Sequence, residues 1–138
     1  MKISKKKTID VIDANRDRLI ELSRSIFEEP ELKFEEHNTV RKLLRELKNV
    51  DGLYIEKGIG NLETAFKASL VGSKRKPTVA MLAEFDALPN IGHRCGHHLI
   101  CTSTVGAMLG LAPMIGELAG TVELIGTPGE EGGAGKNH

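Results

Sequence analysis

A short segment in the second half of the chain concentrates side chains that bind metals. Three histidines and one cysteine lie within six residues, in the run His93-Arg94-Cys95-Gly96-His97-His98. A thiolate and an imidazole two residues apart can reach one divalent cation, because Gly96 lets the backbone turn tightly between Cys95 and His97. The alternative is a polar loop whose imidazoles face water, and the Cys-Gly-His triplet alone does not exclude it.

Acidic residues precede this segment. Asp86 is either a turn or helix-cap residue, or a carboxylate that orients a ligand histidine and raises its basicity. Glu84 is either a neighbour of a metal or a charge at the end of a strand. The sequence position alone does not choose between these alternatives.

A second group of candidate residues is the run Pro128-Gly129-Glu130-Glu131-Gly132-Gly133. Neighbouring side chains of an extended chain point in different directions. One carboxylate could therefore bind a metal while the other holds a water as general base. The alternative is an exposed acidic turn, since charges in glycine-rich loops are usually solvated.

Two further candidates have mainly structural interpretations. His37 falls on the apolar face of a predicted helix, where we expect a packed residue. Cys101 could pair with Cys95 in a redox switch, but a small buried residue at the start of a helix is the better interpretation.

The elements that must position these residues follow from periodicity and breaker residues. Helices are predicted from Thr8 to just before Pro30, over 34–49, and over 98–118 with a break at Pro113. Strands are predicted over 64–71, 78–85 and 121–127.

The succession of strand, helix and strand predicts an α/β fold with a mixed sheet flanked by helices. The run from Val79 to Ala83 is apolar at every position, which predicts a central strand covered on both faces. Both candidate loops follow predicted strands, at Phe85 and Thr127. Open α/β sheets bind ligands at the carboxyl ends of their strands, so we expect the two loops to meet there.

The composition restricts the class of protein. The chain has 138 residues, enough for one domain, and 19 basic residues balance 19 acidic ones. Zero net charge gives no reason to expect nucleic acid or an anionic membrane as a partner. The uncharged stretch over 99–116 is diluted by polar residues, glycines and Pro113, which favours a buried helix over a membrane span. Two cysteines and no visible signal peptide favour the cytoplasm.

Taken together, three strings resemble the zinc-dependent aminoacylase and carboxypeptidase family, in particular its amidohydrolases acting on N-acyl amino acids, aminobenzoyl-glutamate or dipeptides. The strings cover residues 83–89, 92–97 and 126–133, and residues 30–37 also resemble that branch. The resemblance implies that Cys95, His97 and Glu131 are metal ligands. It implies that Glu130 is the general base that activates a metal-bound water, and that Asp86 supports a ligand histidine. It also implies two divalent ions, most simply zinc, with manganese or cobalt as alternatives.

The resemblance also implies that residues 1–138 are a truncated part of a catalytic domain. His98 stands where the branch has Asp or Asn, Ala134 interrupts the usual glycine run, and the chain ends at His138. The remaining ligand histidines and the lid or dimerisation domain are absent, so a homodimer is expected only where that domain is present. We therefore expect a hydrolase of N-acyl amino acids or dipeptides that alone is weakly active or inactive. The alternative functions are a non-catalytic metal-binding or interaction module, and a thiol switch.

Overall fold

The fold is built on a mixed sheet of four strands. The computed structural model describes residues 5–133 and 135, so Ala134 and His138 lie outside the described residues. The strands are β1 (Tyr54–Lys57), β2 (Phe66–Val71), β3 (Lys74–Glu84) and β4 (Ala119–Thr127). Their order in the sheet is β1-β2-β4-β3, with β3 parallel to β4 and the other two pairs antiparallel.

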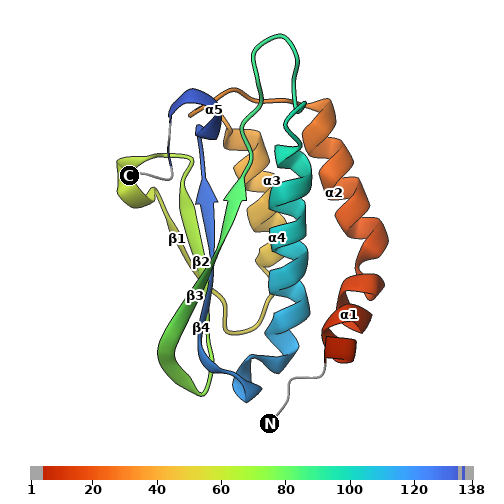
Figure 1. Cartoon of the computed structure of the whole chain (residues 1–138), viewed down its shortest axis with the longest axis vertical. Coiled ribbons are helices and arrows are strands. Elements are labelled where there is room, and N and C mark those ends of the chain that lie inside the picture. The colour runs from red at the N-terminus through yellow and green to blue at the C-terminus, as the bar shows by residue number, and fades with distance from the viewer. Residues whose placement is uncertain (1–4, 134, 136–138) are drawn as a thin grey trace.

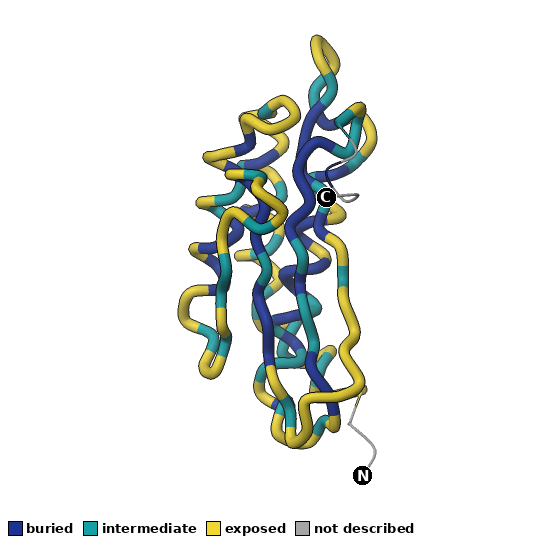
Figure 2. Tube along the Cα trace, turned by 90° about the vertical axis from the view of Figure 1, so that its left-hand side faces the viewer, coloured by how far each residue is buried: buried dark blue, intermediate teal, exposed yellow. Residues whose placement is uncertain are grey.

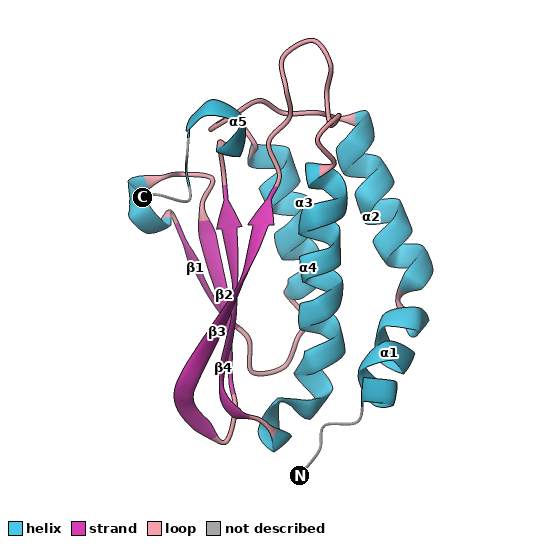
Figure 3. Ribbon diagram, in the orientation of Figure 1, coloured by secondary structure: helices cyan, strands magenta, loops and turns pink. Residues whose placement is uncertain are grey.

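The long helices all cover the same face of this sheet (Figures 1 and 3). They are α1 (Lys5–Ala14), α2 (Arg16–Glu28), α3 (His37–Leu47) and α4 (His97–Leu111). Short turns of helix complete the described residues: η1 (Ile59–Asn61), η2 (Ala112–Glu117) and α5 (Glu130–Gly133). The mixed sheet with helices beside it agrees with the fold class expected from the sequence.

The helices follow the sequence pattern with local differences. The first predicted helix is divided at Asn15, whose side-chain amide donates to the carbonyl of Val11. Thr8 does not cap it, because α1 already begins at Lys5. The predicted break at Pro113 is confirmed, since α4 passes there into the tighter turns of η2.

The prediction of a central, buried strand over Val79 to Ala83 is wrong. β3 is an edge strand. Val79 and Leu82 are 58% and 46% exposed, and Figure 2 shows exposed stretches of the chain in yellow. Within the described residues, the long helices lie on one side of the sheet only, so Leu82, which alternates with the buried Ala83, points to the side without helices. The strand with neighbours on both sides is β4, which pairs with β2 and β3.

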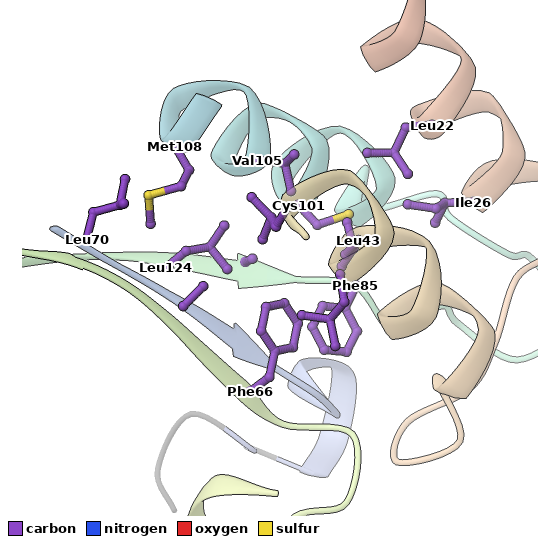
Figure 4. Packing of buried hydrophobic residues seen from close by; sticks show 14 residues of the cluster. Leu22, Ile26, Leu43, Phe66, Leu70, Phe85, Cys101, Val105, Met108 and Leu124 are labelled. Carbon is purple, nitrogen blue, oxygen red and sulfur yellow. The ribbon is translucent and has the colours of Figure 1, made fainter. Parts of the chain in front are cut away.

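The hydrophobic core lies between the sheet and the helices (Figure 4). Phe66 of β2 and Phe85 stack with their ring centroids 6.2 Å apart. Gly126 of β4 lies under the ring of Phe66, which occupies the space that a side chain there would need. Each fully buried apolar side chain contributes about 1.5–3 kcal/mol, so these contacts fix the ends of β2 and β4 beside the loops that follow.

The stretch His97–Glu117 is the one part of the described residues that is long and apolar enough to cross a membrane by length and composition. The core helix of a globular protein meets the same criteria. Here Cys101, Val105 and Met108 of this helix are fully buried in the core beside the sheet.

Candidate metal centre

Two loops meet at one edge of the sheet. The loop from Phe85 to Gly96 follows β3, and the segment from Pro128 to Gly133 follows β4. Because β3 and β4 are parallel and α4 connects them, their carboxyl ends lie side by side. This arrangement brings the two groups of candidate residues together.

His97 is the residue around which the others gather. Gly96 has a left-handed backbone with φ 84°, which turns the chain into α4 so that His97 is the first residue of the helix. The imidazole is only 4% exposed. Its Nδ1 lies 2.8 Å from the backbone carbonyl oxygen of Asp86 and 3.2 Å from the Oδ1 of the same residue. Nδ1 is therefore held by Asp86, and Nε2 is the ring atom left to bind a ligand.

Three carboxylates surround His97 Nε2. The nearest oxygens of Glu84, Glu130 and Glu131 lie 3.6, 3.7 and 3.8 Å from it. One ligand atom each from Glu84, His97 and Glu130 lie within 4.8 Å of one another. Ligand atoms ~2.0–2.3 Å from a common ion are roughly 3–4 Å apart. The donor set therefore fits a divalent cation at Nε2.

Cys95 lies on the same side of the site. The Glu131 carboxylate raises the pKa of the exposed Cys95 thiol, and the carboxylates of Glu130 and Asp86 act in the same direction. The structure thus brings the sulfur of Cys95 and the carboxylate of Glu131 into one place, as the order of the motifs predicted. A cation binding here must displace the thiol proton, because the thiolate is the ligand form.

Asp86 joins the two loops. Its Oδ2 accepts a hydrogen bond of 2.9 Å from the backbone N–H of Glu131, and the residue is 1% exposed. Burial works to raise the pKa of this carboxyl, but the contacts with His97 and with the backbone of Glu131 and Glu130 hold it below its usual value. The Asp86 side chain in turn raises the pKa of His97 to about 9.

A supporting residue that the sequence did not single out is Glu36. Its fully buried carboxylate accepts hydrogen bonds from the backbone N–H of Gly129 at 2.9 Å and from the hydroxyl of Thr64 at 2.8 Å. Burial raises the pKa of Glu36 despite these bonds. The ring of Phe34 fills the space beside Gly129, where a Cβ would collide with it. The resemblance over residues 30–37 indicated this segment, but it did not indicate that the Glu36 side chain supports the loop at Gly129.

His93, His98 and His37 do not belong to the group of side chains around His97 Nε2. His93 is 4% exposed, and burial lowers its pKa to about 4. Its ring lies 5.4 Å from that of His98, which contacts Phe27. The prediction that His37 is packed is wrong, because its side chain is 51% exposed.

The cysteines do not favour a thiol switch. Cys101 is fully buried in α4, as expected, and burial raises the pKa of its thiol to about 12. The thiolate is the form that exchanges with disulfides, so Cys101 is unreactive where it lies. Both cysteines are free.

No protein-family model matches the chain. It is 33% identical over 146 residues to a subunit of the p-aminobenzoyl-glutamate hydrolase of Escherichia coli, an alignment with 92% of this chain and 30% of that protein. It is 37% identical over 147 residues to the Xaa-Arg dipeptidase of Mus musculus, with 99% of this chain and 34% of that enzyme. It is 33% identical over 132 residues to N-acetylcysteine deacetylase of Bacillus subtilis, an alignment with 86% of this chain and 34% of that enzyme.

Solved structures show the same relationship. A dinuclear metal-binding peptidase of the M20 family from Bacillus subtilis superposes with a TM-score of 0.78 at 33% identity, covering 86% of this chain and 37% of that one. A proposed aminohydrolase of methicillin-resistant Staphylococcus aureus gives a TM-score of 0.80 at 27% identity, covering 91% and 35%. The chain spans about a third of the length of these relatives. Sequence and fold together show that the chain is similar, over nearly its whole length, to part of these amidohydrolases and peptidases, one of which is a member of the M20 family.

Proposed function

We propose that this chain carries part of the metal centre of a hydrolase that cleaves the amide bond of an N-acyl amino acid or a dipeptide. The observation that carries the proposal is the buried imidazole of His97, held by Asp86 at Nδ1 and facing three carboxylates at Nε2. Cys95, His97 and Glu131 are the proposed ligands. Thiolate, imidazole and carboxylate together suit zinc, with manganese or cobalt as alternatives.

The names of the relatives support the substrate class. They act on p-aminobenzoyl-glutamate, on dipeptides that end in arginine, and on N-acetylcysteine. Each of these compounds has an amide bond whose amine side is an amino acid. A small molecule of this class is therefore the proposed substrate, in a cytoplasmic enzyme.

The residues of the site have separate tasks in this chemistry. A bound divalent ion supplies a Lewis acid that polarises the amide carbonyl and lowers the pKa of water. The Glu130 carboxylate is 29% exposed and faces the same space as His97 Nε2, so it can take a proton from the attacking water. It then returns that proton to the leaving amine as the carbon–nitrogen bond breaks. Asp86 keeps the imidazole oriented throughout.

We expect the 138-residue chain by itself to bind divalent metal weakly and to hydrolyse these substrates negligibly. Three proposed ligands cannot hold two ions firmly ~3.5–4 Å apart. A family-type homodimer is proposed only where a lid or dimerisation domain accompanies these residues. A non-catalytic metal-binding module is the second candidate function, because the metal site is compact even without the rest of such an enzyme.

The test is to purify the chain, remove metal, and titrate it with Zn²⁺, Mn²⁺ or Co²⁺ before assaying a panel of N-acyl amino acids and dipeptides. Metal binding that weakens in Cys95→Ser and His97→Gln supports the proposed centre. Binding that is absent, or that both variants retain, overturns it. Turnover that Glu130→Gln abolishes would show that a working site is already complete and that the expected inactivity is wrong.

A further inference from the structure

Glu84 faces the candidate metal centre from the end of β3. It is the last residue of β3, and its side chain is 17% exposed. Its Oε2 lies 3.6 Å from His97 Nε2, the shortest of the three distances from that nitrogen to a glutamate. An ordinary charge at a strand end would point to solvent, and this one does not.

The backbone fixes Glu84 in this place. It is paired with Thr127 in the ladder between β3 and β4, three residues before Glu130. Ala83 and Phe85, the neighbours of Glu84 in the chain, are fully buried in the core. A carboxylate attached to such a rigid position is preorganised, which is what a metal ligand needs.

The contact with His97 is too long for a hydrogen bond but suits two ligands of one ion. Hydrogen bonds between nitrogen and oxygen are about 2.7–3.2 Å long, and 3.6 Å lies beyond that range. Atoms bound to the same zinc, manganese or cobalt ion lie roughly 3–4 Å apart. Three carboxylates converge here. A divalent ion balances their negative charge better than a protonated imidazole does, because it carries twice the charge.

We infer that Glu84 is a further metal ligand, binding the same cation as His97. This inference rests on the proposed function, and it divides the donors into two groups. Glu84 and His97 hold one ion through oxygen and nitrogen. Cys95 and Glu131, whose side chains interact electrostatically, hold the other ion through sulfur and oxygen. Glu130 remains the base, because its carboxylate lies 3.7 Å from His97 Nε2 and also acts electrostatically on Cys95.

The experiment is a titration of the metal-free chain with Co²⁺ alone, followed by calorimetry and by absorbance. The sulfur-to-cobalt absorption band reports the ion at Cys95, and the total binding reports both ions. Added to Cys95→Ser, Glu84→Gln should weaken the remaining binding by at least roughly tenfold. As a single substitution, Glu84→Gln should leave the sulfur band in place. Glu123→Gln is the matched control, since Glu123 lies on β4 and faces Ser69, away from the site.

The outcomes separate the two proposals. If Glu84→Gln binds cobalt like the unchanged chain while Cys95→Ser and His97→Gln lose binding, the role of Glu84 is wrong and the metal centre stands. If the unchanged chain binds no cobalt, both proposals fail. Glu84→Asp keeps the charge on a shorter side chain and should bind with intermediate affinity, so it provides a second measurement if Glu84→Gln does not fold.

Discussion

The two ring nitrogens of His97 have different surroundings. Nδ1 meets the backbone and side chain of Asp86, so the ring cannot rotate without losing both contacts. Nε2 faces carboxylates at distances that a cation can bridge. Without a cation, the same surroundings favour a proton on the ring.

This proton has a consequence for stability that can be measured. The Asp86 side chain raises the pKa of His97 from 6.5 to about 9 in the folded, metal-free chain. The folded state therefore binds the proton more tightly than the unfolded state. The stabilisation, roughly 3 kcal/mol, is fully present below pH 6.5 and is lost as the pH rises towards 9. Urea unfolding with a chelator present, at both ends of this range, measures the loss. In His97→Gln the loss should disappear, and an unchanged loss in that variant contradicts the assignment.

Glu36 is a second residue whose effect can be isolated. Replacing it by alanine leaves the Gly129 N–H and the Thr64 hydroxyl without their acceptor inside the protein. We expect Glu36→Ala to lower the free energy of unfolding by about 1–3 kcal/mol, and to weaken metal binding because Gly129 adjoins Glu130. Its neighbour Glu35 is exposed, so Glu35→Ala should change stability by less than about 0.5 kcal/mol. Equal effects of the two substitutions on urea unfolding would refute the role of Glu36.

At the scale of elements, the site depends on how closely β2 approaches β4. The register pairs Phe66 with Gly126, and the Phe66 ring lies over the glycine. This contact sets the end of β4 just before the segment that carries Glu130 and Glu131.

Adding one methyl group at this contact tests its importance. In Gly126→Ala the new Cβ meets the Phe66 ring, so we expect a loss of about 1–3 kcal/mol in the free energy of unfolding. Gly116→Ala is the matched control, because no atom lies within 4 Å of the Cβ that it adds. Thermal or urea unfolding compares the two variants. Gly126→Ala as stable as the control would mean that β2 and β4 separate easily, and that their close packing does not fix the site.

At the scale of the whole molecule, the helices leave one face of the sheet open and β3 at its edge (Figure 1). Charged residues and Pro77 in the first half of β3 disfavour pairing with another chain, but the second half presents Val79 and Leu82 to solvent. An exposed apolar edge strand is a template for pairing with another chain.

We therefore expect the purified chain to associate as its concentration rises, as sedimentation velocity can detect. Leu82→Lys places a charge on the exposed part of β3 and should shift the chain towards the monomer. Thr78→Lys, on the same strand but at a position that is already polar and exposed, should have a smaller effect. A chain that stays monomeric at every concentration, or that associates equally in both variants, contradicts the role of this edge.

The sequence by itself determined which segments form the site. The two motifs follow strands joined by one apolar helix, and parallel strands bring their carboxyl ends together, so the meeting of His97 with Glu130 and Glu131 was predictable from local order. The start of α4 and the break near Pro113 were also predictable, because breaker residues act locally.

Only the tertiary structure decided which strand is central, which carboxylates face His97 and what supports the loops. An apolar run such as Val79 to Ala83 indicates a hydrophobic strand. The place of that strand in the sheet depends on its pairing with strands far away in sequence. Glu36 reaches Gly129 across 93 positions of the chain. Such contacts leave no periodic signal, because burial and distance in space, rather than spacing along the chain, determine their partners.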